Sequence, residues 1–137
     1  MTNKKILGLI GLSARARKIS FGADSVETQA KKGKVKLFII AEDASERTKD
    51  KFNKLAIQCN IPIIIHGSIE ELSKAIGKNN KAILGIEDIN LSREIEKINN
   101  KYFKSMIVPN TIKTMYLEQN EKLLKIINII KNKINEI

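Results

Sequence analysis

The residues best suited to bind a ligand lie between Lys18 and Gly33, where a glycine precedes the start of a helix. Within Gly22-Ala23-Asp24-Ser25, either Asp24 or Ser25 can cap that helix. The first N–H groups of a helix lack intrahelical acceptors and attract anions, and a glycine lets a ligand approach the backbone closely. Cations that can hold phosphate flank this segment: Arg15, Arg17, Lys18, Lys31 and Lys32. We expect the helix start and these cations to form one face that binds a polyanion.

The positive charge of the chain is unevenly distributed. The net charge is +10, and residues 1–36 hold nine Lys/Arg against two Asp/Glu, a net charge of +7. Residues 37–100 hold nine against ten, a net charge of −1, and residues 101–137 hold seven against three, a net charge of +4. A localised basic segment is typical of nucleic-acid binding. A generally lysine-rich composition is the alternative explanation.

Residues that could catalyse a reaction are few. His66 is the only histidine and Cys59 the only cysteine, so no Cys/His zinc site is expected. The glycines of residues 8–11 lack the spacing of a dinucleotide-binding motif. Glu42 and Asp43 follow a strand and could hold Mg²⁺ in a hydrolase, or simply favour the start of the next helix. We expect no metal, no cofactor and no enzymatic activity. A small metal-assisted hydrolase that uses Glu42 and Asp43 is a weaker alternative.

Helices and strands that position these residues alternate along the chain. Helices are predicted near residues 6–15, 24–33, 45–59, 68–77 and 89–98, an extended piece over 18–21, and strands over 35–41, 63–65 and 81–86. The strand over 35–41 has the continuous apolar pattern of a strand covered on both faces, and 63–65 is predicted as a second central strand. The order predicts an α/β fold, a three-layer α/β/α sandwich around a small mixed sheet, plus a C-terminal helical extension.

Two parts of the chain differ in pattern. Residues 1–99 are predicted to form the α/β/α domain, and residues 100–137 an extension made of a linker and an amphipathic helix that starts at Asn120. The apolar seam of that helix consists of Leu123, Ile127, Ile130, Ile134 and Ile137. Such a seam fits packing against the domain or self-association.

Three features of the sequence indicate that the protein is located in the cytoplasm. No apolar run approaches the ~20 residues that span a bilayer, so no membrane partner is expected. The apolar N-terminal segment is interrupted by glycines and followed at once by Arg15, which favours a helix over a signal peptide. A single cysteine fits a reducing compartment.

Several segments resemble one family in the same order along the chain. The run from Lys18 to Asp43, Asn60-Ile61-Pro62, the segment Glu71–Gly77 and the strand ending at Gly85-Ile86 look like the kink-turn-binding ribosomal-protein superfamily. This group includes archaeal and eukaryotic large-subunit ribosomal proteins and small bacterial relatives, and the bacterial branch is the most similar. The resemblance covers roughly residues 4–98.

The resemblance also implies where RNA would bind. The family pattern Gly-x-Asn-Glu, with a lysine three positions later, maps to Gly22, Asp24, Ser25 and Thr28, with Ala23 as the variable position. Only the glycine is shared, and Asp24 keeps acceptor oxygens without the amide donors of Asn. A second family contact, the loop after the last strand, maps to Ile86-Glu87-Asp88-Ile89.

Together these patterns predict a cytoplasmic, non-enzymatic protein that binds RNA, and the resemblance implies structured RNA of the kink-turn kind. Ribosomal RNA and association with the ribosome are implied by the resemblance. The alternative is a protein–protein interaction module that kept the fold and lost specific RNA recognition, as the departures at Asp24, Ser25 and Thr28 suggest.

Overall fold

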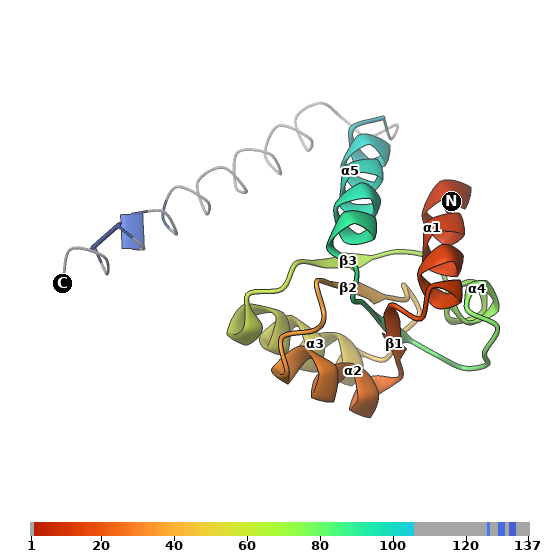
Figure 1. The fold of residues 1–137 in the computed structure, drawn as a ribbon, viewed down its shortest axis with the longest axis horizontal. Coiled ribbons are helices and arrows are strands. Elements are labelled where there is room, and N and C mark those ends of the chain that lie inside the picture. Colours follow the sequence, from red (N-terminus) through yellow and green to blue (C-terminus); the bar gives the residue numbers. More distant parts are fainter. Residues whose placement is uncertain (1, 106–125, 127–128, 131, 134–137) are drawn as a thin grey trace. The chain divides into compact units, whose positions relative to one another are not determined.

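The structure is a computed structural model that describes residues 2–105, 126, 129–130 and 132–133 (Figure 1). The chain divides into two compact units, residues 1–102 and 103–137. The order of elements is α1 (Lys4–Arg15), β1 (Ile19–Phe21), α2 (Ala23–Lys31), β2 (Leu37–Ile40), α3 (Glu46–Cys59), β3 (Ile63–Ile65), α4 (Ile69–Ala75), β4 (Ile83–Ile86) and α5 (Ile89–Ser105).

The four strands form one mixed sheet in the order β1-β4-β2-β3. β4 pairs antiparallel with both β1 and β2, and β2 pairs parallel with β3. Phe21 lies opposite Leu84 and Ile19 opposite Ile86 in the β1–β4 register. Every residue of the two central strands is buried, which confirms the prediction for the strand near residues 35–41.

Helices cover both faces of this sheet. In Figure 1, α2 and α3 lie on one face, and α1, α4 and the start of α5 lie on the other. The predicted three-layer α/β/α sandwich with a small mixed sheet is therefore confirmed. Phe38 on β2 and Phe52 on α3 are fully buried and meet edge to face, with ring centroids 5.5 Å apart, so they join the sheet to one helical layer.

Local signals in the sequence explain most helix boundaries. Asn3 caps α1 by accepting hydrogen bonds from two backbone N–H groups, and Ser45 caps α3. Ser68 and Glu71 form a capping box at the start of α4, where the sequence predicted a helix. Asn60 takes the left-handed conformation that ends α3 before the following strand.

Two predictions about the elements were wrong. The strand over residues 63–65 lies at the edge of the sheet, where β3 pairs with β2 alone and Ile65 is 53% exposed. An apolar run of three isoleucines does not distinguish an edge from a centre, because both need a buried face. The start of α2 was expected to be capped by Asp24 or Ser25, but its N-cap is Gly22 and no side chain caps it.

The remaining sequence predictions concern residues beyond Ser105. The predicted helix from Asn120 lies mostly outside the described residues, and its seam does so except at Ile130. The predicted division at residue 99 stays a prediction. No helix in the described ranges has the length and apolar character needed to cross a membrane.

Candidate nucleic-acid interface

The turn at Gly22 joins β1 to α2 and leaves the start of the helix open. Gly22 has φ +85° and ψ 150°, a conformation that residues with a Cβ atom rarely adopt. Its N–H donates to the carbonyl oxygen of Ile83 at 3.1 Å, which fixes the turn to the start of β4. Because no side chain caps α2, the N–H groups of Ala23, Asp24 and Ser25 are directed outward from an exposed helix end. This end of the molecule can therefore accept an anion.

The loop between α4 and β4 brings lysines to the same turn. The Lys81 ammonium lies 3.9 Å from the position a Cβ atom would take on Gly22. The ammonium groups of Lys78 and Lys81 lie 5.4 and 5.6 Å from the centroid of the Phe21 ring, respectively. Ser73 holds the loop in place, since its hydroxyl accepts from the N–H of Lys81 at 2.7 Å. We call residues 22–25 and 78–81 together the Gly22 face.

Arg15 lies beside the helix from which this loop starts. Helix α1 packs against α4, and a Cβ atom placed on Gly11 would meet both the carbonyl oxygen of Ala75 at 3.2 Å and the guanidinium of Arg15 at 3.7 Å. The Arg15 side chain is thus positioned near the C-terminal end of α4. A cation there complements the partial negative charge of a helix end.

Arg17 and Lys18 lie at the other end of β1 from Gly22. They precede Ile19, which pairs with Ile86, whereas the Gly22 end of the strand adjoins Ile83. The segment Ile86–Ile89 begins at this same distant end, because the N–H of Glu87 donates to the carbonyl oxygen of Lys18 at 2.9 Å. The antiparallel pairing of β1 with β4 therefore separates the second predicted contact from the first.

The side chains of Ile86–Ile89 also have structural roles. Ile86 is fully buried in the central strand, so its side chain is out of reach of a ligand. The Asp88 carboxylate accepts a hydrogen bond from the N–H of Leu91 at 2.9 Å and so stabilises the start of α5. Ile89 is 44% exposed beside it.

The C-terminal half of α2 carries the other predicted residues. Thr28 is exposed, but its hydroxyl donates to the carbonyl oxygen of Asp24 within the helix. Lys31 and Lys32 follow at the far end, about 13 and 15 Å from Gly22 at 1.5 Å per residue. Lys31 forms an ion pair with Glu27 at 3.8 Å. The expected single face of cations is thus distributed over separate parts of the molecule.

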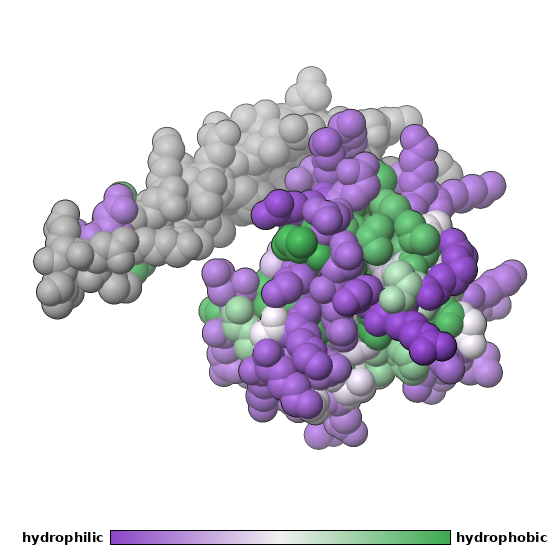
Figure 2. Space-filling model, in the orientation of Figure 1, coloured by the Kyte–Doolittle hydropathy of each residue, from purple (hydrophilic) through white to green (hydrophobic). Residues whose placement is uncertain are grey.

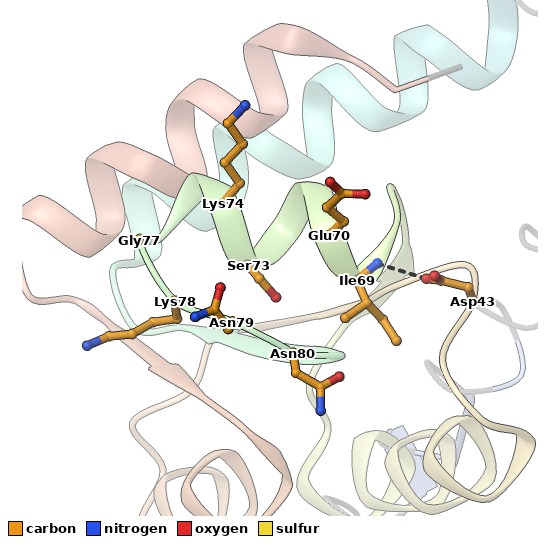
Figure 3. A pocket seen from close by; sticks show the side chains of 9 residues that line it. All are labelled: Asp43, Ile69, Glu70, Ser73, Lys74, Gly77, Lys78, Asn79 and Asn80. Carbon is orange, nitrogen blue, oxygen red and sulfur yellow. Dashed lines mark hydrogen bonds between the residues drawn. The ribbon is translucent and has the colours of Figure 1, made fainter.

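An open cavity of about 810 Å³ adjoins the α4–β4 loop (Figure 3). It is lined by residues of α4 and the loop together with Asp43, whose carboxylate accepts from the N–H of Ile69 at 2.8 Å. Figure 3 places this hydrogen bond on one side of the cavity and Lys78 on the other, with Asn79 and Asn80 between them. Amide side chains and a lysine can bind both the edges of a base and a phosphate.

The residues weighed for catalysis have structural partners. Asp43 is engaged with α4, and no group of three or more His, Cys, Asp and Glu that could hold a metal occurs within the described residues. His66 is buried, and its Nε2 accepts from the N–H of Asn3 at 3.1 Å. Burial lowers the pKa of His66, against the opposing effect of Glu42. The Thr2 hydroxyl and the Ser68 N–H lower the pKa of Glu71.

Sequence reasoning missed Lys78 and Lys81. The polar segment Lys78–Lys81 between a helix and a strand has the composition of a turn, and its two lysines are a signal in the sequence for a phosphate contact. Their position beside Gly22 depends on the pairing of β1 with β4, elements more than sixty residues apart. No local pattern specifies that pairing.

Comparison with known proteins identifies relatives of this fold. The chain is 30% identical over 95 residues to the RNA-binding protein YlxQ of Enterococcus faecium, covering 69% of this chain and 91% of that protein. It is also 30% identical over 91 residues to the RNA-binding protein YlxQ of Bacillus subtilis, covering 64% of this chain and 88% of that protein.

Solved structures share the architecture. A Bacillus halodurans protein superposes with a TM-score of 0.67 at 34% identity, covering 69% of this chain and 96% of the other. The Giardia lamblia 15.5 kD RNA-binding protein superposes with a TM-score of 0.59 at 24% identity, covering 69% and 88%, and this likeness shows the fold alone. Residues 4–96 match the profile of the Ribosomal protein L7Ae/L30e/S12e/Gadd45 family. The chain belongs to that family.

Proposed function

We propose that this protein binds structured RNA of the kink-turn kind through the Gly22 face. The observation on which the proposal most depends is the position of the Lys81 ammonium, 3.9 Å from the Cβ position of Gly22. It brings a cation next to an uncapped helix start, so that one phosphate can meet both. The names of the YlxQ relatives also support an RNA ligand.

Different groups of the face have different parts in this proposal. Backbone N–H groups of residues 23–25 and the ammonium groups of Lys78 and Lys81 bind phosphate, which positions the RNA without reading its sequence. The Asp24 carboxylate offers only acceptors and therefore selects the N–H groups on the edge of an unpaired base. The cavity beside Asn79 and Asn80 receives a base that is turned out of the helix at a kink.

The proposal extends to the setting of the protein. It acts in the cytoplasm as a binding protein without catalytic activity, and ribosomal RNA is its target. The +7 charge of residues 1–36 supports a polyanionic partner.

A binding experiment with matched variants tests the proposal. The probe is an RNA hairpin with an internal loop of tandem G·A pairs, compared with a fully paired hairpin of equal length. The wild type should bind the looped hairpin more tightly, and Lys78→Ala/Lys81→Ala should weaken that binding and lower the salt slope by about 1–2. The control is Lys97→Ala/Lys101→Ala, which removes the same charge from exposed positions on α5.

Equal binding of the two hairpins by the wild type would overturn kink-turn recognition. Equal binding by the two double variants would overturn the assignment of the Gly22 face. Either result can be interpreted directly, because Lys78, Lys97 and Lys101 are exposed and Lys81 is partly buried, and alanine keeps the backbone N–H groups with which Lys78 and Lys81 bond to Ser73.

A protein-interaction module is the second candidate, favoured by one observation. Thr28 stands where the family pattern has a lysine, so no cation is present at this position. Its hydroxyl donates to the backbone carbonyl oxygen of Asp24 within the helix. Affinity capture with and without nuclease separates the two candidates. Partners that persist after nuclease treatment support the module, whereas partners that disappear support RNA.

A further inference from the structure

A second group of charged residues lies between α2 and α3, away from the Gly22 face. These helices pack side by side on one face of the sheet (Figure 1), and a groove of about 690 Å³ runs between them. Four cations and two acids line it, a net charge of +2. The charged residues are Glu27, Lys31, Arg47, Asp50, Lys51 and Lys54. Figure 2 shows a mainly hydrophilic surface on the face of the molecule turned to the viewer.

The helical period concentrates the cations of α3 on one side. Arg47, Lys51 and Lys54 follow at i, i+4 and i+7, so their side chains project from the same face of the helix. In the linear sequence these residues alternate with acids and polar residues, which hides the concentration of charge. The fold therefore creates a cationic surface that the local net charge of −1 over residues 37–100 does not reveal.

Ion pairs neutralise only part of this groove. The Glu27 carboxylate lies 3.8 Å from the ammonium of Lys31 and 3.4 Å from that of Lys51, so one acid serves two cations. Among residues 2–105, no ion pair joins Arg47 or Lys54 to a carboxylate. Two cations thus remain available to an outside partner.

Helix α2 connects the groove with the Gly22 face. Asp24, Thr28 and Lys31 follow at i, i+4 and i+7 along one exposed side of the helix, from its start at Gly22 to the groove. The distance of about 13 Å corresponds to a few nucleotides, with the phosphate spacing of about 3.4 Å along one strand of duplex DNA as the scale. An RNA strand bound at the Gly22 face reaches the groove without leaving the surface.

We propose that the α2–α3 groove binds the phosphate backbone of the RNA segment that continues from the Gly22 face. This inference rests on the proposed function. RNA fits better than an acidic protein segment, because Leu55 is the one apolar residue among those that line the groove, whereas the core of a protein–protein interface is more apolar and poor in charged residues. The groove contributes affinity and carries no sequence preference.

Two hairpins and three variants test this proposal. Both hairpins contain the internal loop of tandem G·A pairs. The flanking stem of the short hairpin has fewer than about four base pairs and ends before the groove, and that of the long hairpin continues for about one further helical turn, ten base pairs. Arg47→Ala/Lys54→Ala removes the two cations without an intramolecular ion pair, so the fold keeps its contacts. This variant should bind the long hairpin roughly tenfold more weakly, with a salt slope lower by about 1–2, and bind the short hairpin like the wild type.

Glu27→Gln provides a change in the opposite direction. It releases Lys31 and Lys51 from their shared carboxylate and should strengthen binding of the long hairpin, an effect that a merely structural role would not produce. Lys97→Ala/Lys101→Ala on α5 is the charge-matched control and should leave the preference for the long hairpin unchanged.

Each outcome decides between the proposals. Unchanged binding of the long hairpin by Arg47→Ala/Lys54→Ala overturns the groove and leaves the Gly22 face intact. Failure of the wild type to bind either hairpin overturns the proposed function itself. An oligoglutamate peptide is the probe for an acidic protein partner. If the peptide binds through Arg47 and Lys54 while binding of the long hairpin does not depend on these two residues, the groove binds an acidic protein segment and not RNA.

Discussion

Gly22 combines a structural and a functional requirement in one residue. Its φ of +85° lets the chain turn from β1 into α2, and the Lys81 ammonium lies 3.9 Å from the position of a Cβ atom on this residue, beside the helix start. The sequence marked this glycine, because a glycine before a helix indicates a special backbone conformation. The hydrogen bond from its N–H to Ile83 could not be predicted, since it joins distant elements.

Replacing Gly22 with alanine should destabilise the protein. A Cβ atom is strained at this φ and ψ, so Gly22→Ala should lower the free energy of unfolding by about 1–3 kcal/mol, measured by urea denaturation. Gly8→Ala is the matched control, because Gly8 lies within α1 with no atom near its Cβ position. That change should raise the free energy of unfolding by about 0.5–1 kcal/mol. A Gly22→Ala protein as stable as the wild type would contradict the assigned backbone strain.

His66 illustrates a residue whose chemistry serves the fold. Its buried imidazole accepts a hydrogen bond from Asn3 and so ties the start of α1 to the end of β3. The sequence predicted no zinc site for this histidine, the only one in the chain. The structure supplies the specific partner, which lies 63 residues away in the chain.

Stability should fall as the pH drops through the range of histidine titration. Burial lowers the pKa of His66 from 6.5, so the unfolded chain takes up the proton first and the folded state loses stability below about pH 6.5. Thermal unfolding between about pH 7.5 and 5.5 should show a smaller decrease in His66→Gln, which keeps an acceptor but does not titrate. Glu71 affects stability at lower pH. Because its pKa is lowered in the folded protein, its contribution to stability is present above about pH 4.5 and is lost as the pH falls below that value. Identical pH profiles for the wild type and His66→Gln would refute this role.

At the level of elements, β4 organises both the core and the Gly22 face. It pairs with β1 and β2, and the carbonyl oxygen of Ile83 at its start accepts a hydrogen bond from the N–H of Gly22. The loop before β4 carries Lys78 and Lys81. Helix caps such as Ser45 and Ser68 could be predicted from the sequence, because each acts within a few residues. The order of the strands could not, because it depends on contacts between segments far apart in the chain.

Gly85 allows the close packing of β4 with its neighbours. A Cβ atom there would lie 2.7 Å from the Ser20 hydroxyl and 2.9 Å from a methyl group of Val35, so Gly85→Ala should cost about 1–3 kcal/mol of unfolding free energy. Chemical denaturation measures this cost. In a Val35→Ala background the same change should cost less, because one of the two clashes is removed. An equal cost in both backgrounds would show that Val35 does not restrict this position.

For the whole molecule, the distribution of charge matters more than its sum. The sequence predicted a polyanion partner from the net charge of +7 over residues 1–36. The fold places these cations in separate regions and adds Lys78 and Lys81 from a segment with little net charge. Total charge therefore indicated the kind of ligand, whereas the position of the site required the three-dimensional arrangement.

The most direct test of the Gly22 face is to map the RNA-binding residues of the protein by NMR. On titration with the looped hairpin, the backbone amide signals of residues 22–25 and 78–81 should shift or broaden, while those of the segment Ile86–Ile89 at the opposite end of β4 should change little. The paired hairpin of equal length serves as the reference. Changes confined to Ile86–Ile89, or the same changes with both hairpins, would contradict the account.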